Sequence, residues 1–355
     1  MAQRSLTRSL GLGAVVVLVI GNIIGSGVYK KVAPMAAELH SPGWVLLCWV
    51  LGGVISLFGA LSNAEVAGLL ADTGGEYSYY KKIYNRFFAF LFGWSLFTII
   101  QTASISSLAY VFAQSFRELV PLPELLNSWS NYSLGGIFYP FSNFTEKATA
   151  IILIVLLTMV NMRGIKTGTG VSTAILVLVF VGIFTIIIFG LTSKQAQIAP
   201  VFSLETPPNS PITLSAIFTA MLAAFWAYQG WAAIGYVGGE VLDAKRTIPR
   251  GIAVGVLVVI FTYLLVNITY LSLISIDEFE TIQRTVWLTG KAPIAAVEAV
   301  RKFWGSGGAV FISFLILVTT LGCANATILA SCRPYYAMAR EGLFFRPVAK
   351  LNSAS

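Results

Sequence analysis

Apolar residues gather in eight long runs along the chain. The runs cover about 9–30, 43–67, 87–112, 148–163, 170–192, 212–237, 251–273 and 305–331, and the fourth is the shortest. A helix needs roughly 20 apolar residues to cross the hydrocarbon core of a bilayer. Because no water reaches the backbone there, its polar groups must be satisfied within each segment. The pattern therefore predicts eight membrane-spanning helices.

The composition excludes a soluble domain. Of the 355 residues, 57% are hydrophobic and 11% are charged, and the mean hydropathy is +0.80. Soluble domains carry about 25% charged residues. The net charge of +8 would suggest a nucleic-acid partner for a soluble protein. In a chain that spans a bilayer, the charge instead indicates orientation, so we expect lipid around the chain and no nucleic-acid partner.

The distribution of Lys and Arg predicts a cytoplasmic N-terminus. With that orientation, 14 of the 23 cations lie inside, Arg4 among them, and the others, including Lys291, lie outside. Such a bias is typical of plasma-membrane proteins with several spans. Segments 114–147 and 274–303 are then expected to be long outer loops. The aromatic and basic segment 68–86 is expected to lie along the inner membrane surface.

The sequence shows no motif typical of an enzyme or of a metal site. His40 is the sole histidine, and the three cysteines, Cys48, Cys323 and Cys332, fall in or at the edge of apolar runs. No His-Glu-x-x-His or Gly-x-Ser-x-Gly motif occurs. We therefore expect no metal, no cofactor and no enzymatic activity. A receptor-like protein without transport activity stays open as an alternative.

Two of the runs are interrupted by polar and glycine residues. The first contains "GNIIGSGVY" (21–29), and the sixth contains "FWAYQGWAAIGYVGGE" (225–240). "GNIIG" also fits a small-residue packing face between helices. However, interrupted helices at matching places in two halves indicate a transporter built from inverted repeats. The N–H groups freed by a break suit a carboxylate and the freed carbonyls suit an ammonium, so the pattern predicts an amino acid substrate.

Four segments together resemble the amino acid–polyamine–organocation superfamily, and within it the L-type amino acid transporters. They are "GNIIGSGVY", "SNAEVAGLLADTGGEYSYYKKIY", "FWAYQGWAAIGYVGGEVLDAKRTIPRGI" and "CANATILASCRPYYAMAREGLFF". The similarity runs in register over about residues 6–346. It implies an all-α integral membrane protein with the LeuT-type fold, in which two inverted five-helix repeats hold the substrate between helices one and six.

The resemblance also implies how the chain divides into repeats and that the second repeat is incomplete. Residues 1–355 form a single permease domain, in which 9–192 are the first repeat, 212–331 are an incomplete second repeat and 332–355 are an inner segment. Members of the family have twelve helices, of which ten form the core. The chain is therefore expected to be a fragment or a truncated product that stops after the eighth helix, with an incomplete core.

The site residues are carried over from the resemblance. Backbone groups of the first helix bind the carboxylate and ammonium, Trp226 is an aromatic gate over the substrate, and Glu65 belongs to the inner gate. The remaining substrate-binding positions lie in the unwound part of the sixth helix and on the eighth helix. The full set is Ile23, Ile24, Gly25, Ser26, Gly27, Trp226, Ala227, Tyr228, Gly230 and Asn325.

Two departures from the family bear on mechanism. The group often carries a Lys on the fifth helix that bridges helices one and eight, and our register places Val179 there. Sodium held by hydroxyls such as Thr319, Thr320 and Thr327 could replace it, although such hydroxyls usually bond to their own helix. Animal members attach a heavy subunit through a cysteine between helices three and four. Segment 114–147 has none, so no disulfide-linked subunit is expected.

The predicted function is transport of small to medium neutral L-amino acids by exchange, with sodium-coupled symport as the alternative. The size preference follows from the bulk of Trp226 beside the small Ala223 and Ala224. Because no acidic residue is predicted in the middle of a span, we expect cationic amino acids to be excluded.

Overall fold

The computed structural model describes residues 8–137, 139–208, 210–289 and 294–351. Arg4, Lys291 and residues 352–355 of the inner segment lie outside the described residues. Within the described part, the secondary structure consists of helices joined by turns, and eight helical segments are long and apolar enough to cross a membrane. The prediction of an all-α protein with eight spans is confirmed.

The spans coincide with the predicted runs: the first and sixth are slightly shorter than predicted, and the others extend beyond the run at one or both ends. They are Leu12–Lys30 (α1 Leu12–Ile23 and α2 Gly27–Lys30), Pro42–Leu69 (α4), Arg86–Leu119 (α6 Arg86–Ser95, the π-helix η1 Leu96–Ile100 and α7 Gln101–Leu119), Phe144–Asn161 (α8), Ile165–Leu191 (α9), Leu214–Tyr236 (α10 Leu214–Tyr228 and the 3-10 helix η4 Trp231–Tyr236), Ala244–Leu273 (α11) and Ala295–Arg340 (α13).

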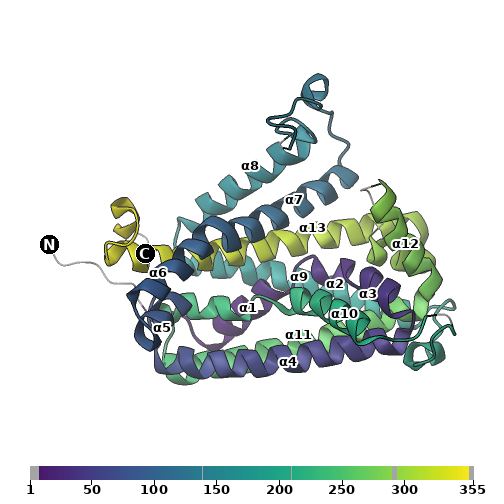
Figure 1. Cartoon of the computed structure of the whole chain (residues 1–355), viewed down its shortest axis with the longest axis horizontal. Helices are drawn as coiled ribbons and strands as arrows, with labels where there is room; N and C mark the ends of the chain where they lie inside the picture. Colours follow the sequence, from purple (N-terminus) through teal and green to yellow (C-terminus); the bar gives the residue numbers. More distant parts are fainter. Residues whose placement is uncertain (1–7, 138, 209, 290–293, 352–355) are drawn as a thin grey trace.

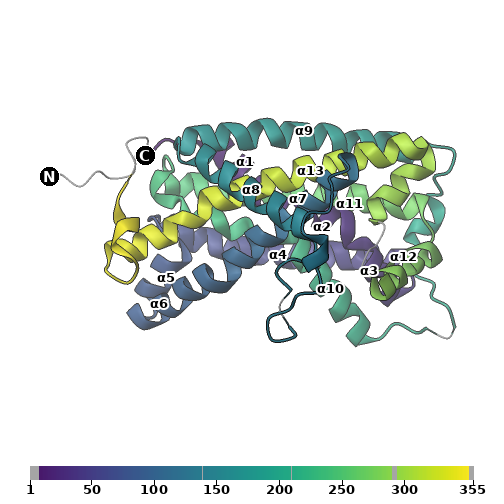
Figure 2. The same cartoon turned by 90° about the horizontal axis from the view of Figure 1, so that it is seen from above.

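The long helices run side by side between two ends of the molecule. Figures 1 and 2 show α5 (Glu76–Ile83), α6 and the end of α13 at one end, and α3 (Val32–Leu39) and α12 (Ile276–Thr289) at the other. The core packs α1 and α4 against α11, and α13 against α7 and α9. Alternate faces of the helices stay exposed, as lipid-facing surfaces require; on α9, Val177, Leu178 and Val181 are examples.

One predicted outer loop is wrong in its secondary structure. Segment 274–303 was expected to be a loop, but most of its described residues form α12 and the first turns of α13. α12 packs against α3, and the His40 Nδ1 atom lies 2.6 Å from the Glu280 Oε1 atom across that contact. The segment is too polar to span, which is what the hydropathy pattern detected, but its alternating apolar residues, such as the buried Phe279, pack as a helix.

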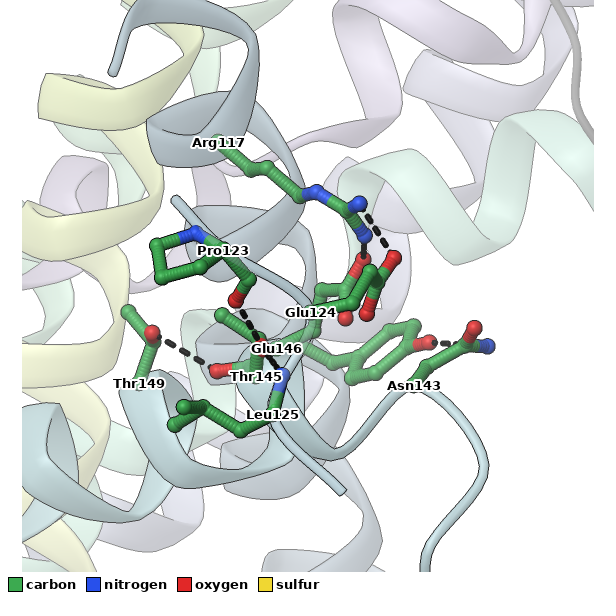
Figure 3. A network of polar contacts seen from close by, with 9 residues as sticks. Arg117, Pro123, Glu124, Leu125, Asn143, Thr145, Glu146 and Thr149 are labelled. Atoms are coloured by element: carbon green, nitrogen blue, oxygen red, sulfur yellow. Dashed lines mark hydrogen bonds and ion pairs between the residues drawn. The ribbon is translucent and has the colours of Figure 1, made fainter. Parts of the chain in front are cut away.

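The connection between α7 and α8 is held by a polar network (Figure 3). Arg117, near the end of α7, pairs with Glu124 of the connection and with Glu146 in the first turn of α8. The Thr145 hydroxyl accepts a hydrogen bond from the Leu125 N–H at 2.9 Å and donates to the Pro123 carbonyl at 2.8 Å. These contacts fix the spacing of α7 and α8 at one end, and they lie outside the central cavity described next.

Candidate functional site

The interior holds a cavity of about 940 Å³ between α1, α4, α7 and the two parts of the sixth span. Its size lies within the range of small-molecule sites. Most of its wall is neutral, and both helix interruptions contribute to it. The wall residues that enter the argument below are Asn22, Ile23, Gly25, Ser26, Gly27, Glu76, Gln101, Trp226, Ala227, Gln229, Gly230 and Tyr236.

The first span is broken at the cavity wall. α1 ends at Ile23, and the chain becomes extended at Ile24 before α2 begins at Gly27. The N–H groups of Gly25 and Ser26 meet no hydrogen-bond acceptor among the described residues. Unpaired backbone groups are costly in a dry interior. An acceptor supplied by a ligand would satisfy them.

The sixth span is broken opposite the first. α10 ends at Tyr228, Gln229 is extended, and Gly230 has a φ of +128° before η4 begins. In the described structure no N–H group of Gln229 or Gly230 closes the last turn of α10, so the carbonyls there lack the partners of a continuing helix. Phe225 and Trp226, whose carbonyls lose their i+4 partners in this way, line the same cavity as Gly25 and Ser26.

Two glycines bring the breaks into contact. A Cβ atom on Gly230 would lie 2.3 Å from the Asn22 carbonyl oxygen, and one on Gly27 would lie 2.9 Å from the Cα atom of Ala227. Neither separation is compatible with a side chain. The two interruptions are therefore a single structural unit in which one backbone packs directly on the other.

Tyr263 of α11 joins the two interruptions, and the sequence interpretation missed it. Its hydroxyl oxygen lies 3.1 Å from the Ile23 carbonyl and 3.1 Å from the Ala227 carbonyl, and the residue is fully buried. No pattern in the sequence separates Tyr263 from Tyr270 two turns later, whose buried hydroxyl has no partner among the described residues.

Replacing Tyr263 with Phe should weaken substrate binding roughly five- to tenfold, since one net hydrogen bond contributes about 1 kcal/mol. The measurement is the concentration of alanine that half-saturates exchange in proteoliposomes. Tyr270→Phe, on the same helix, is the matched control and should leave that concentration unchanged. Equal effects of the two substitutions would contradict a specific role for the Tyr263 hydroxyl.

Trp226 lies over the junction of the two interruptions. It lines the cavity, and its Cζ3 atom would lie 3.3 Å from a Cβ atom on Gly27. The Lys31 ammonium lies 4.3 Å from the centre of the indole ring. A cation over a tryptophan face is attractive. The ring is thus held between the first-span break on one side and a cation on the other.

Seven of the ten predicted binding residues line the cavity. Ile24 and Tyr228 do not; both are buried, and the Tyr228 hydroxyl donates to the Trp49 carbonyl at 3.2 Å. Asn325 is not part of the wall either. The residues of the predicted set that the cavity brings together are Ile23, Gly25, Ser26, Gly27, Trp226, Ala227 and Gly230.

Asn325 belongs to an interhelical network. Its Oδ1 atom accepts from Asn161 of α8 at 2.9 Å, and its Nδ2 atom donates to the Gly168 carbonyl at 3.1 Å and to the Ser172 hydroxyl at 2.9 Å. These bonds tie α8, α9 and α13 together. They use its amide within the protein, so we assign Asn325 to positioning the helices.

Glu65 lies on an exposed face of α4, away from the cavity wall. Of the described carboxylates at this end of the molecule, that of Glu240 is buried. Glu240 pairs with Arg333 of α13 at 3.0 Å, and its carbonyl accepts from the N–H groups of Ser9 and Leu10. This arrangement ties the start of the first span to the sixth and eighth, as an inner gate would require.

The fifth-helix position discussed above is aliphatic. Val179 is buried, and Ile175 one turn earlier contacts Gly322 of α13. Because α9 carries no Lys beyond Lys166 in its first turn, a different register would not supply the family's lysine. The Thr319, Thr320 and Thr327 hydroxyls each donate to a carbonyl of their own helix.

Two features of the wall had no clear sequence signal. The π-helix η1 interrupts the third span and places Leu96, Ile100 and the following Gln101 on the cavity. Such π-turns are frequent at functional sites. Glu76, which fell in the segment expected to lie on the membrane surface, also lines the cavity. The sequence argument against cationic substrates considered acidic residues within the spans, and Glu76 lies between two spans.

Comparison with known proteins identifies the chain's relatives. The family model described as "Amino acid permease" matches residues 10–354. The serine/threonine exchanger SteT of Bacillus subtilis is 30% identical over 96% of this chain and 70% of its own length. The human b(0,+)-type amino acid transporter 1 is 26% identical over 98% of the chain and 66% of its own length. Human large neutral amino acids transporter small subunit 2 is 27% identical over 95% and 59%.

The chain thus spans about 59–70% of the length of these relatives. They are named as transporters and exchangers, which confirms the resemblance to the L-type transporters and the expectation that the chain is not an enzyme. The matched family model covers nearly the whole chain, and the eight spans agree with it. The protein is a membrane protein of the amino acid permease family, in the amino acid–polyamine–organocation superfamily.

Proposed function

We propose that this protein exchanges small to medium neutral L-amino acids across the plasma membrane. One observation carries the proposal: the breaks in the first and sixth spans meet at the wall of one cavity, with unbonded N–H groups at the first break and an incomplete last helical turn at the sixth. A zwitterion needs both kinds of group within one small space. Its carboxylate would accept from the N–H groups of Gly25 and Ser26, and its ammonium would donate to carbonyls at the end of α10.

Trp226 is suited to be the gate above this site. The ring packs against Gly27, the first residue of α2, and the Lys31 ammonium lies over the ring. Movement of the ring away from Gly27 would open a path between α2 and α10. The Glu240–Arg333 pair would be the gate at the other end of the cavity. Glu65, on the exposed face of α4, would act on this gate only through its helix.

Substrate size and charge follow from the wall. Gly27, which has no side chain, and the small Ala227 meet at the junction, and Trp226 limits the space beside it. The names of two relatives, a serine/threonine exchanger and a large neutral amino acids transporter subunit, support neutral substrates. Exchange is proposed ahead of sodium coupling because SteT, a relative of similar sequence, is named as an exchanger.

The orientation is part of the proposal. With a cytoplasmic N-terminus, the cation-rich end with α5 and α6 faces the cytoplasm, and α3 and α12 face outward. Segment 114–147 has no cysteine, and Cys48 and Cys323 are buried. A heavy subunit attached through a disulfide in that segment is therefore not proposed.

Uptake of labelled alanine into proteoliposomes tests the function. We expect uptake into vesicles preloaded with unlabelled alanine or serine, little uptake into empty vesicles, and no dependence on sodium. Binding of alanine is measured in parallel by its effect on the unfolding temperature of the purified protein. Sodium-dependent uptake into empty vesicles would replace exchange with symport. The proposal would be overturned if the protein showed neither binding nor uptake of any neutral amino acid.

A further inference from the structure

We infer that the connection between α7 and α8, residues 120–143, is a membrane anchor whose aromatic tip lies in the lipid head-group layer, at the end of the bundle that also holds α3 and α12. The partner is the bilayer itself, and the contact is made by uncharged side chains. This surface lies outside the central cavity, so its contact with lipid does not depend on the substrate.

The connection differs in charge from the others at its end of the bundle. Residues 125–144 are a run of twenty without an Asp, Glu, Lys, Arg or His. The three connections that join the other spans at this end each carry charged residues, among them Lys31, Glu205 and Glu280. At the composition of a soluble domain, such a run would contain about five charged residues. The run therefore has the composition of a segment that meets a less polar medium than bulk water.

The side chains that this run exposes are large and either apolar or amphipathic. The exposed fractions of Trp129 and Ile137 are 56% and 89%, and Tyr132, Leu134 and Tyr139 are exposed as well. Trp and Tyr are enriched where a membrane meets water, because each combines an apolar ring with one polar group. A surface of this kind is favourable against lipid head groups and unfavourable in bulk water.

The tip is built around paired aromatic rings. The ring centres of Trp129, Tyr132 and Phe141 lie 5.9–6.3 Å from one another, and Phe141 pairs in turn with Phe144 at the start of α8. These rings pack on one another, while Trp129 and Tyr132 keep nearly half of their surface or more exposed. The exposed aromatic surface is thus held in place by the connection itself.

The charged groups beside the run have partners within the connection and its two helices. Arg117 pairs with Glu124 and Glu146 (Figure 3). Lys147, in the first turn of α8, donates to the Tyr139 carbonyl at 2.7 Å. Its ammonium thus turns from the apolar body of α8 toward the connection, as a lysine does near the edge of the hydrocarbon. The base of the connection carries paired charges, and its tip carries none.

The length of α8 places the connection at the level of the head groups. α8 (Phe144–Asn161) has 18 residues and is the shortest span. At 1.5 Å per residue it is about 27 Å long, against a hydrocarbon core of about 30 Å. Arg163 is exposed just after α8 and has to reach water at the opposite surface. Figure 1 shows α8 inclined to α4 and α11, and the connection beside the bundle, short of the end that α12 occupies. Phe144 therefore lies at the hydrocarbon boundary.

The lipid-facing side of α8 continues into the connection. The exposed apolar residues of α8 recur at the spacing of one helix face; they are Ile151, Ile152, Val155, Leu156 and Met159. Lys147 lies one turn before Ile151 on the same face, and Lys147 is the residue that binds the Tyr139 carbonyl. The connection thus adjoins a surface that lipid already covers, which favours lipid as its partner.

Quenching of a fluorescent label tests the anchor. The label is attached through Ile137→Cys and, as the matched control, through Glu205→Cys, an exposed position in the connection between α9 and α10 at the same end. Cys332→Ser removes the exposed native thiol, and Cys48 and Cys323 are buried. In vesicles of phosphatidylcholine, a nitroxide on the lipid head group should quench the Ile137→Cys label at least about threefold more than the control label, and aqueous iodide at least about threefold less.

Two further conditions identify the partner. Dilution of the protein in lipid should leave the quenching unchanged, and so should replacement of part of the phosphatidylcholine by anionic phosphatidylglycerol, because the contact is uncharged. Leu134→Cys is a second reporter if Ile137→Cys does not elute as a single species in detergent. Equal access of iodide to both labels would overturn the anchor. Shielding that is lost on dilution would assign the surface to a second copy of the chain, and shielding that requires phosphatidylglycerol would assign it to a charged head group; either result would also overturn it.

Discussion

Replacing Gly230 with Ala should reduce alanine exchange at least about a hundredfold. The new Cβ atom would lie 2.3 Å from the Asn22 carbonyl oxygen and 2.7 Å from its carbon. Both neighbours are backbone atoms, so neither can rotate away. The φ of +128° is in addition strained for any L side chain, at a cost of order 1–3 kcal/mol. Relief of the clash must separate the two helix breaks, and with them the donors and acceptors of the site.

The measurement is initial uptake into preloaded proteoliposomes, normalised to the amount of protein that elutes as a single species in detergent. Gly13→Ala, in the helical part of the first span, is the matched control. No atom lies within 4 Å of a Cβ there, and alanine favours the helix, so uptake should be unchanged. Normal uptake by a well-folded Gly230→Ala protein would show that the two breaks do not need their close contact.

The sequence was sufficient for the spans and for the location of the two breaks. Lipid imposes a length and an apolar composition on each span, and these are readable without a structure. Gly25, Gly27 and Gly230 stood out because glycine is unfavourable in a continuous helix. That Gly230 rests on Asn22, about two hundred residues away, is a property of packing that no local pattern contains.

For the polar residues, the sequence shows the chemistry of the side chain but not its location in the fold. Asn325 and Glu65 have the chemistry of site residues, but the rotation of their helices turns one into a network with Asn161 and Ser172 and the other to an exposed face. Glu76 lies in a basic, aromatic segment of low hydropathy, which is typical of a membrane surface. Only the fold of α5 back against the sixth span brings it to the cavity.

These positions indicate how the two ends of the site are held. At one end, Lys31 and Trp226 close over the first-span break. At the other, Glu240 and Arg333 connect the sixth and eighth spans. The first contact is partly exposed and therefore weak, since cation–π pairs at exposed sites contribute about 0.5–1 kcal/mol. The second is buried, so opening the cytoplasmic end in the proposed orientation must disturb the stronger interaction.

Removing one partner of the buried pair should be strongly destabilising. The exposed fractions of the Glu240 and Arg333 side chains are 4% and 13%. Arg333→Gln would leave the Glu240 carboxylate without its cation, and loss of one member of a buried pair costs about 3–5 kcal/mol. We expect a clear fall in the unfolding temperature of the purified protein in detergent, and a similar fall for Glu240→Gln.

The double variant distinguishes a specific pair from two independent losses. With both charges replaced, no uncompensated charge remains, so Glu240→Gln with Arg333→Gln should be less destabilised than the sum of the two single variants. Lys81→Gln is the control: its ammonium pairs with Glu341 at 2.6 Å, but 42% of its side chain is exposed. Exposed pairs contribute about 0–1 kcal/mol, so its unfolding temperature should barely change. Additive effects in the double variant would show that Glu240 and Arg333 do not act as a pair. The contact between the sixth span and the start of the first would then depend on the backbone bonds from Ser9 and Leu10 to the Glu240 carbonyl.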